Sequence, residues 1–330
     1  MLTAIVSDRM LLPYLDHLRQ AVPHPYRWVS AETPDSAPML EELVGADVFV
    51  GWHFTSAMAH RAQKLRFIQV SGAGCDGIAF EALARGVVVA NTYGHERAIA
   101  EYVVMAMIAL SRRLLENHDS MRRGMWASIF SSPLGWPHHE ISGRTVGLLG
   151  FGHVGREVAR LLRSFGTRVM ALDPYLEKDR LDTYGLDRVC GPNDIEVLFS
   201  ESDFLVLALP LTPETTGLVD GRLLSLMRRD SFLINVARGP IVQEDALFEA
   251  LSSGRLAGAA LDVWYSYPEQ GKESQVHPSR YPFHSLANVI MTPHCSGRTE
   301  ETTFRRIETI AENLRRFAKG EQLLNVLPVR

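Results

Sequence analysis

Basic clusters, long apolar runs and closely spaced cysteines are missing from this 330-residue sequence, and each absence excludes a class of protein. No run of Lys or Arg exceeds two residues, and the formal net charge is -4. This charge pattern gives no support for binding to nucleic acid or to an anionic membrane surface. The longest strongly apolar stretch, residues 102–110, is too short to cross a bilayer. We therefore expect no nucleic-acid partner and no membrane partner.

Cysteine is scarce, and the three cysteines, Cys75, Cys190 and Cys295, lie far apart in the sequence. Their odd number and wide spacing fit a reducing compartment better than a disulfide framework. The first ten residues lack a basic segment followed by an apolar core, so we expect no secretory signal and a cytoplasmic location. Cys and His residues are not paired at the short spacing of a zinc site, so we predict no metal.

The remaining composition is that of a globular protein, with 46% hydrophobic and 22% charged residues. A chain of this length exceeds the usual size of one hydrophobic core, so two domains are expected. Short apolar runs alternate with longer amphipathic segments, as in parallel sheets with crossover helices. The sequence thus predicts an α/β fold with two Rossmann-like, doubly wound parallel-sheet domains.

The expected elements follow from these alternations. In the first domain we expect strands at residues 3–7, 47–51, 66–70 and 87–91, and helices at 9–21, 38–44 and 77–85. One long helix is expected over 99–123, followed by a loop at 131–143. In the second domain we expect strands at 146–150, 168–173, 204–208, 232–236, 257–261 and 289–291, and a final helix at 300–319.

The strongest local signal is a glycine fingerprint, Gly150-x-Gly152-x-x-Gly155, between an expected strand and an expected helix. The first glycine permits a tight turn, the second lets a pyrophosphate approach the backbone, and the third lets helix and strand pack closely. The N–H groups of His153 and Val154 would then face the phosphates at the positive end of the helix dipole. This pattern predicts a dinucleotide site.

Asp173 ends the next expected strand, where a carboxylate accepts hydrogen bonds from a ribose diol and repels a 2′-phosphate. It therefore favours NAD over NADP. A glycine-rich turn with an unrelated surface aspartate is the alternative interpretation of these residues.

Three polar residues follow consecutive expected strands, Arg238, Asp262 and His294. A guanidinium binds a carboxylate through two hydrogen bonds and polarises a neighbouring keto oxygen. A histidine gives or takes the hydroxyl proton as a hydride moves. In isolation, Arg238 would be a surface ion-pair residue and His294 a core or capping histidine. Their position after a dinucleotide fingerprint favours the catalytic interpretation.

Together these motifs resemble the D-isomer-specific 2-hydroxyacid dehydrogenase family over nearly the whole chain. The matching segments are residues 71–76 (SGAGCD), 99–101 (IAE), 123–126 (RGMW), the glycine fingerprint, 209–215 (LPLTPET), 235–239 (NVARG), 258–263 (GAALDV) and 292–294 (TPH).

The resemblance implies specific roles. Arg238 would bind the substrate carboxylate and carbonyl, helped by the backbone N–H groups of Ala73 and Gly74. His294 would be the acid/base, and Asp262 would bind the nicotinamide amide. The remaining expected cofactor contacts are Leu209, Pro210, Val236, Ala237, His294, Ser296 and Gly297.

The resemblance also implies how the chain is organised. Residues 1–97 and 295–330 would form a discontinuous substrate-binding domain, and residues 98–294 an NAD-binding domain. The active site would lie in a cleft between the two domains. The long helix near Ile99 would help to form a homodimer. The expected activity is hydride transfer between NAD(H) and a small D-2-hydroxy acid or 2-keto acid.

One position departs from the family pattern. Tyr267, before Pro268, stands where a Glu normally pairs with the catalytic histidine, and a neutral phenol stabilises an imidazolium less than a carboxylate does. Tyr267 could replace the carboxylate in an active enzyme with an acid-shifted pH profile. Alternatively, Glu269 or Glu273 could reach His294 from the long segment that follows. The third alternative is an NAD(H)-sensing binding protein or corepressor with little turnover.

Overall fold

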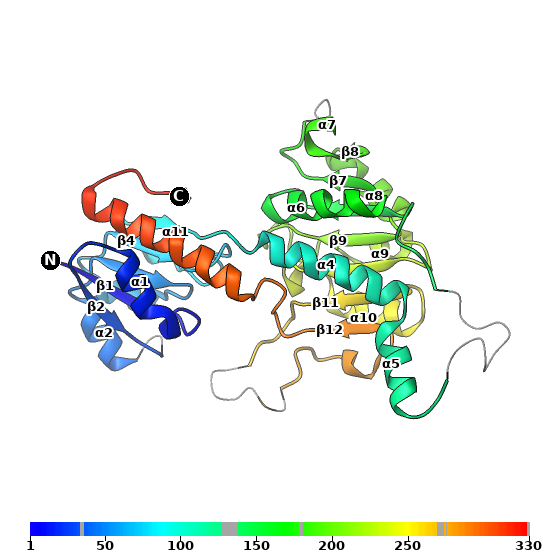
Figure 1. Ribbon diagram of the computed structural model, residues 1–330, viewed down its shortest axis with the longest axis horizontal. Coiled ribbons are helices and arrows are strands. Elements are labelled where there is room, and N and C mark those ends of the chain that lie inside the picture. Colours follow the sequence, from blue (N-terminus) through cyan, green and yellow to red (C-terminus); the bar gives the residue numbers. More distant parts are fainter. Residues whose placement is uncertain (34–35, 127–137, 178–180, 269–273, 275, 329–330) are drawn as a thin grey trace. The chain divides into compact units, whose positions relative to one another are not determined.

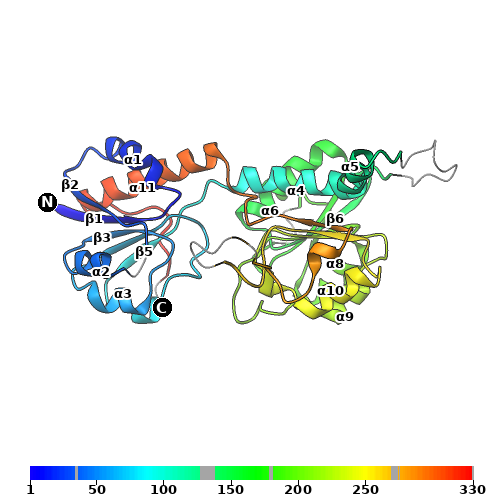
Figure 2. The same ribbon diagram turned by 90° about the horizontal axis from the view of Figure 1, so that it is seen from below.

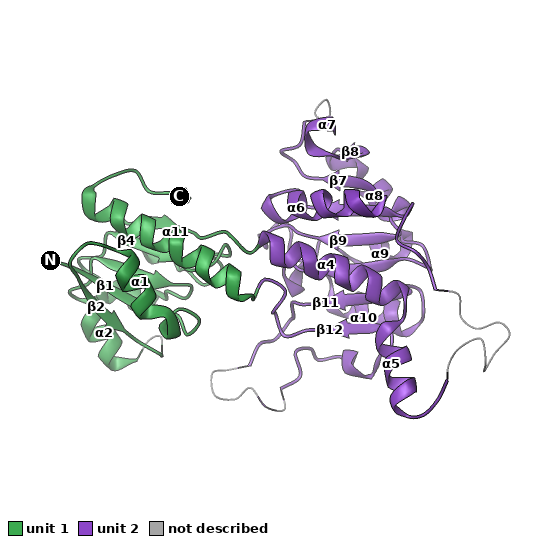
Figure 3. Ribbon diagram, in the orientation of Figure 1, with its two compact units in different colours: residues 1–95, 298–330 green, residues 96–297 purple. Residues whose placement is uncertain are grey.

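The computed structural model describes residues 1–33, 36–126, 138–177, 181–268, 274 and 276–328. The chain forms two compact units, unit 1 with residues 1–95 and 298–330 and unit 2 with residues 96–297 (Figure 3). Each unit has its own parallel β-sheet with helices on both faces. The predicted α/β class with two Rossmann-like sheets is therefore confirmed.

Unit 1 is built on a parallel sheet with the strand order β2-β1-β3-β4-β5 (Figure 1). Its strands are β1 (Leu2–Ser7), β2 (Tyr26–Ser30), β3 (Val48–Gly51), β4 (Phe67–Val70) and β5 (Val88–Ala90). The helices α1 (Leu15–Ala21) and α11 (Glu300–Lys319) cover one face, and α2 (Ala37–Leu43) and α3 (Ser56–Arg61) cover the other (Figure 2). Every residue of β3 and β4 is buried, as expected for parallel strands covered on both faces.

Unit 2 is built on a larger parallel sheet with the order β12-β11-β10-β9-β6-β7-β8. Its strands are β6 (Thr145–Leu149), β7 (Arg168–Leu172), β8 (Arg188–Cys190), β9 (Phe204–Leu207), β10 (Phe232–Asn235), β11 (Gly258–Leu261) and β12 (Val289–Met291). Its helices are α4 (Glu96–Ser111), α5 (Leu114–Arg122), α6 (His153–Leu162), α7 (Leu181–Tyr184), α8 (Ile195–Glu201), α9 (Gly221–Leu226) and α10 (Glu244–Ser252). One face packs on α4 and α6, the other on α8, α9 and α10 (Figure 2). The order reverses at β6, where ligands of such sheets bind.

Three predicted helices differ from the structure. The expected helix 9–21 begins as α1 only at Leu15, after a separate short turn at Leu12–Tyr14. The expected helix 99–123 is divided into α4 and α5 by Arg113, whose φ of 49° is left-handed. The expected helix 77–85 is reduced to a short turn at Phe80–Ala82, because the backbone before it pairs with Phe54. This tertiary pairing overrides the amphipathic pattern of the segment. The expected loop 131–143 lies partly outside the described residues.

The last helix, α11, forms where the sequence predicts it, and clear signals mark its ends. The Thr299 side chain accepts a hydrogen bond from the Thr302 N–H at 3.1 Å, and Gly320 ends the helix with a φ of 71°. The Tyr26 hydroxyl donates to the Leu314 carbonyl at 2.7 Å, which ties the helix to the sheet of unit 1. In the described part of the chain, every helix falls short of the length or apolarity that crossing a bilayer requires.

Candidate active site

The glycine loop after β6 has the geometry that a pyrophosphate requires. Gly150 has a φ of 96°, and a Cβ there would lie 2.5 Å from the Ala208 carbonyl oxygen. A Cβ on Gly155 would lie 2.5 Å from the Gly150 carbonyl oxygen, so both positions exclude a side chain. A Cβ on Gly152 would meet nothing within 4 Å. The first and third glycines are therefore steric requirements of the turn, whereas the second leaves open space directly before α6.

Asp173 follows β7 and is anchored beside this loop. Its carboxylate accepts hydrogen bonds from the Phe151 N–H at 2.9 Å and the Tyr175 N–H at 3.0 Å, one on each oxygen. Each carboxylate oxygen can accept a second hydrogen bond, so a ribose hydroxyl could still bind. The residues of this edge of the sheet thus fit a dinucleotide, with Gly152 leaving room for phosphate and Asp173 offering acceptors.

Arg238 lies in a tightly held turn just after β10. The Asn235 side chain holds both sides of this turn, because its amide donates to the Arg238 carbonyl at 3.0 Å and its oxygen accepts from the Ala237 N–H at 3.0 Å. Gly239 packs so closely on Trp264 that a Cβ would lie 2.3 Å from the Trp264 carbonyl oxygen. The backbone position of Arg238 is thus fixed from within unit 2.

His294 lies at an equivalent position two strands away. The register aligns Asn235 of β10 with Leu261 of β11 and with Met291 of β12. Arg238 and His294 therefore follow the same row of the sheet at the same sequence distance. Neighbouring strands are about 4.8 Å apart, so the two turns begin about 10 Å from each other. His294 has a φ of 55°, which is uncommon for a residue with a side chain.

Asp262 holds the turn that carries His294. It is fully buried, and its carboxylate accepts hydrogen bonds from the Thr292 hydroxyl at 2.6 Å, the Cys295 N–H at 2.8 Å and the Ser296 N–H at 2.9 Å. Three of its roughly four acceptor positions are thus in use. These contacts fix the backbone directly after His294 and hold Thr292, two residues before it, by its side chain. The expected contact of Asp262 with nicotinamide stays a prediction.

Tyr267 pairs directly with His294. Its hydroxyl oxygen lies 3.0 Å from the His294 Nδ1 and accepts a hydrogen bond from the Trp264 N–H at 3.2 Å. The Trp264 indole also donates to the Thr292 carbonyl at 2.8 Å. Trp264 therefore links the turn of Tyr267 to the turn of His294. Sequence reasoning assigned no role to Trp264, whose only signal is its position next to the unusual tyrosine.

The other predicted residues divide between the two units. In unit 2, the predicted cofactor contacts follow the carboxyl ends of their strands: Leu209 and Pro210 after β9, Val236 and Ala237 after β10, and Ser296 and Gly297 after β12. Ala73 and Gly74 belong to unit 1, in the turn after β4. The Asn91 amide donates to the Ala73 carbonyl at 3.0 Å and so holds that turn.

Two further expectations concern the alternative partners of His294 and metal binding. Glu269 and Glu273, the alternative partners of His294, lie outside the described residues. Among the residues that the structure describes, no group of three or more His, Cys, Asp or Glu side chains could hold a metal ion.

Known proteins resemble this chain in sequence and architecture. The model of the D-isomer specific 2-hydroxyacid dehydrogenase NAD binding domain matches residues 104–296. The chain is 32% identical over 299 residues to a glyoxylate reductase of Korarchaeum cryptofilum, covering 89% of this chain and 86% of that protein. It is 32% identical over 294 residues to a D-3-phosphoglycerate dehydrogenase of Methanocaldococcus jannaschii, covering 88% of this chain but 53% of that protein. The chain therefore spans about half the length of this relative.

Solved structures agree with this assignment. The 2-hydroxyacid dehydrogenase from Ketogulonicigenium vulgare Y25 superposes with a TM-score of 0.79 at 26% identity, over 99% of each chain. The match of the NAD-binding model, together with the glycine loop of the structure, identifies the cofactor as NAD. The chain belongs to the D-isomer specific 2-hydroxyacid dehydrogenase family.

Proposed function

We propose that the protein reduces a small 2-keto acid to the D-2-hydroxy acid, with Arg238 as the substrate anchor and His294 as the acid/base. The observation that carries this proposal is the Tyr267–His294 pair at 3.0 Å, in a turn that Asp262 holds through the Thr292 side chain and the N–H groups of Cys295 and Ser296. An acid/base needs a fixed ring and a partner for its second nitrogen, and His294 has both.

Arg238 supplies the positive charge that the substrate requires. Its guanidinium can bind a carboxylate in two hydrogen bonds and polarise the adjacent carbonyl. We add the N–H groups of Ala73 and Gly74 as further donors to the carboxylate. When bound, NAD supplies or accepts the hydride.

The proton that completes reduction comes from the His294 Nε2, because Nδ1 faces Tyr267. After the transfer the ring keeps its Nδ1–H, and the Tyr267 oxygen accepts this hydrogen bond in both states of the ring. A phenol oxygen has two acceptor positions and one hydrogen. The Trp264 N–H takes one acceptor position and His294 the other, so the phenol can support the acid/base without changing its own protonation.

The relatives point to a class of substrate. Glyoxylate reductases and D-3-phosphoglycerate dehydrogenases are named after substrates that share a carboxylate beside the reacting carbon. Arg238 would bind that shared carboxylate, and this contact does not depend on the side chain of the substrate. We therefore propose small 2-keto acids as the class to test.

The decisive experiment measures NADH oxidation with a panel of 2-keto acids, from glyoxylate to phenylpyruvate, at about pH 5.5 to 8.5. The proposal expects turnover that is lost in Arg238→Ala and His294→Ala. Tyr267 in place of a carboxylate favours a second candidate, an NAD(H)-sensing binding protein or corepressor. Tight NADH binding without turnover on any acid would support that candidate instead.

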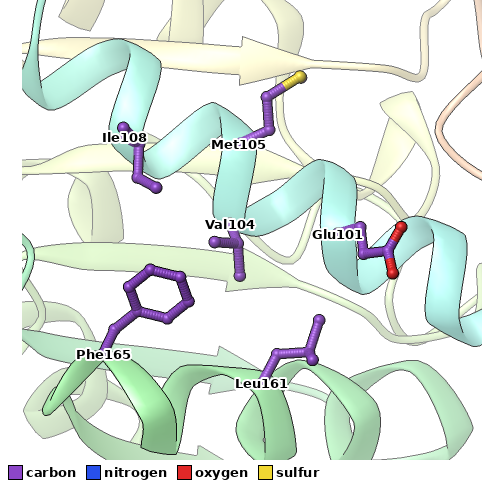
Figure 4. Close-up of a pocket in the computed structure, with 6 residues that line it drawn as sticks. All are labelled: Glu101, Val104, Met105, Ile108, Leu161 and Phe165. Atoms are coloured by element: carbon purple, nitrogen blue, oxygen red, sulfur yellow. The ribbon is translucent and has the colours of Figure 1, made fainter.

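We also propose that the chain forms a homodimer through α4. Figure 4 shows a hollow between α4 and α6 whose apolar lining is partly exposed to solvent. The residues that line it are Glu101, Val104, Met105, Ile108, Leu161 and Phe165. Further exposed apolar side chains follow on α5 and after it, namely Leu114, Leu115, Met121, Met125 and Trp126. Such a concentration of exposed apolar surface is typical of an interface.

Sedimentation equilibrium tests the homodimer. The wild type should have the mass of two chains, and Met105→Glu should reduce it toward one because a charge cannot be buried in an apolar contact without a partner. A wild type with the mass of a single chain at micromolar concentration would contradict the proposal.

A further inference from the structure

Tyr102 on α4 makes a polar contact that the proposed chemistry has not used. Its ring is buried in the core between α4 and the sheet of unit 2, with 9% of its surface exposed. Its hydroxyl lies 2.7 Å from the Thr292 hydroxyl. In sequence Tyr102 belongs to an apolar run, and packing alone would be satisfied by phenylalanine.

The direction of this hydrogen bond follows from the group beyond it. The Thr292 hydroxyl lies 2.6 Å from a carboxylate oxygen of Asp262, which accepts its proton. Thr292 then has no proton left for Tyr102, so the Tyr102 hydroxyl must be the donor. Burial raises the pKa of Tyr102 to about 12, so the hydroxyl keeps this proton at neutral pH.

The chain of hydrogen bonds therefore runs from α4 to the turn of His294. Tyr102 donates to Thr292, Thr292 donates to Asp262, and the same carboxylate accepts the N–H groups of Cys295 and Ser296. Linked hydrogen bonds polarise and strengthen one another in a buried environment. The Tyr102 hydroxyl is thus connected with Thr292 before His294, and through Asp262 with Cys295 and Ser296 after it. His294 itself has a positive φ.

We propose that Tyr102 is a positioning residue, whose hydroxyl sets the orientation of the His294 ring through Thr292 and Asp262. The proposal rests on the proposed role of His294 as acid/base. A ring that is free to tilt loses alignment with the substrate oxygen, and small misplacements of a reacting group reduce turnover strongly. Binding of NADH at the glycine loop and of the keto acid at Arg238 should be little affected, because these groups lie outside the hydrogen-bond chain that starts at Tyr102.

Tyr102→Phe keeps the ring and removes only the hydroxyl. We expect kcat to fall about three- to tenfold, the loss of one modest hydrogen bond, while both KM values stay within about twofold. Thr292→Val should have the same effect, and Thr292→Ser, which keeps a hydroxyl, should restore most of kcat. Tyr26→Phe is the matched control, because it removes a buried hydroxyl with a hydrogen bond of the same 2.7 Å length from unit 1. It should lower the Tm without changing kcat.

A second readout does not need turnover. In protein labelled with ¹³C at the histidine Cε1, the signal that disappears in His294→Ala identifies His294. Tyr102→Phe should shift this signal and leave the other histidine signals in place, whereas Tyr26→Phe should not move it. An inactive wild type that shows this shift would contradict the proposed function but support the positioning role.

An unchanged His294 signal and a kcat within about twofold of wild type would overturn the inference, even if the Tm falls as in Tyr26→Phe. If Tyr102→Phe does not fold, the comparison of Thr292→Val with Thr292→Ser decides the question by the same two readouts. Equal kcat and equal His294 signals in that pair would overturn it.

Discussion

Replacing Tyr267 by Glu should extend keto-acid reduction to higher pH. The proposed reduction uses the protonated form of His294, and a carboxylate at position 267 would stabilise that form more than the phenol does. The protonated ring would then persist to higher pH, so the alkaline limb of the rate profile should move upward.

The size of the effect follows from the geometry of the pair. The Tyr267 oxygen lies 3.0 Å from the His294 Nδ1, and a Glu side chain reaches less far from the backbone than Tyr, so the two charge centres of a carboxylate–imidazolium pair would be about 5–6 Å apart. At an effective dielectric constant of about 20 this gives about 3 kcal/mol. Tyr267 is 50% exposed, so solvent reduces the gain to about 1–2 kcal/mol. Since about 1.4 kcal/mol corresponds to one pH unit, we expect a shift of about one unit.

The assay is kcat/KM for keto-acid reduction from about pH 5.5 to 9. Tyr267→Gln is the matched control, because the amide has the shape of Glu without its charge and should leave the limb within about 0.3 pH units of wild type. Identical profiles for the Glu and Gln variants would refute the coupling between positions 267 and 294.

Three further predictions address the cofactor site and the stability of the fold. Asp173→Ala should lower kcat/KM with NADH more than with NADPH, and equal losses would refute the role of this carboxylate in cofactor choice. Gly152→Ala should keep its Tm but bind NADH at least about tenfold more weakly, as measured by fluorescence titration, whereas Gly150→Ala should lose Tm because its Cβ has no space. The guanidinium groups beside Glu312 lower the pKa of this carboxyl from 4.5 to about 2, so its contribution to stability is present above about pH 4.5 and lost toward pH 2. Thermal unfolding should therefore show Glu312→Gln below wild type at pH 7 and equal to it near pH 2.

Strands with continuous apolar runs could be located from the sequence because both of their faces are covered. β3 and β9 are examples, since every one of their residues is apolar and buried. The strands β2 and β8 lie at the edges of their sheets and include residues that are exposed or partly exposed, so they lack this signal. The break at Arg113 also had no signal, because neither Gly nor Pro marks this position, where Arg113 takes the left-handed conformation.

In the candidate site, too, some features could be predicted from the sequence and others could not. The order of Arg238, Asp262 and His294 along the chain was enough to place them after neighbouring strands, because parallel strands end at one edge. The hydrogen-bond partners of Asp262 could not be predicted from the order of residues along the chain. Its three donors come from a turn about 30 residues away in sequence, and only the folded chain brings them together. The link to Tyr102 spans 190 residues and depends on how α4 packs.

The turn held by Asp262 also has a mechanical consequence, because it ends where the chain leaves unit 2. Gly297 is the last residue of that unit, and Ser296, directly before it, donates its N–H to Asp262 at 2.9 Å. A torque on the backbone from residue 298 onward would reach this hydrogen bond before it reaches His294. Torsions at Gly297 can absorb such a rotation at low cost. We therefore expect the Asp262 carboxylate to keep the turn of His294, the proposed proton donor, in place when the backbone beyond Gly297 rotates.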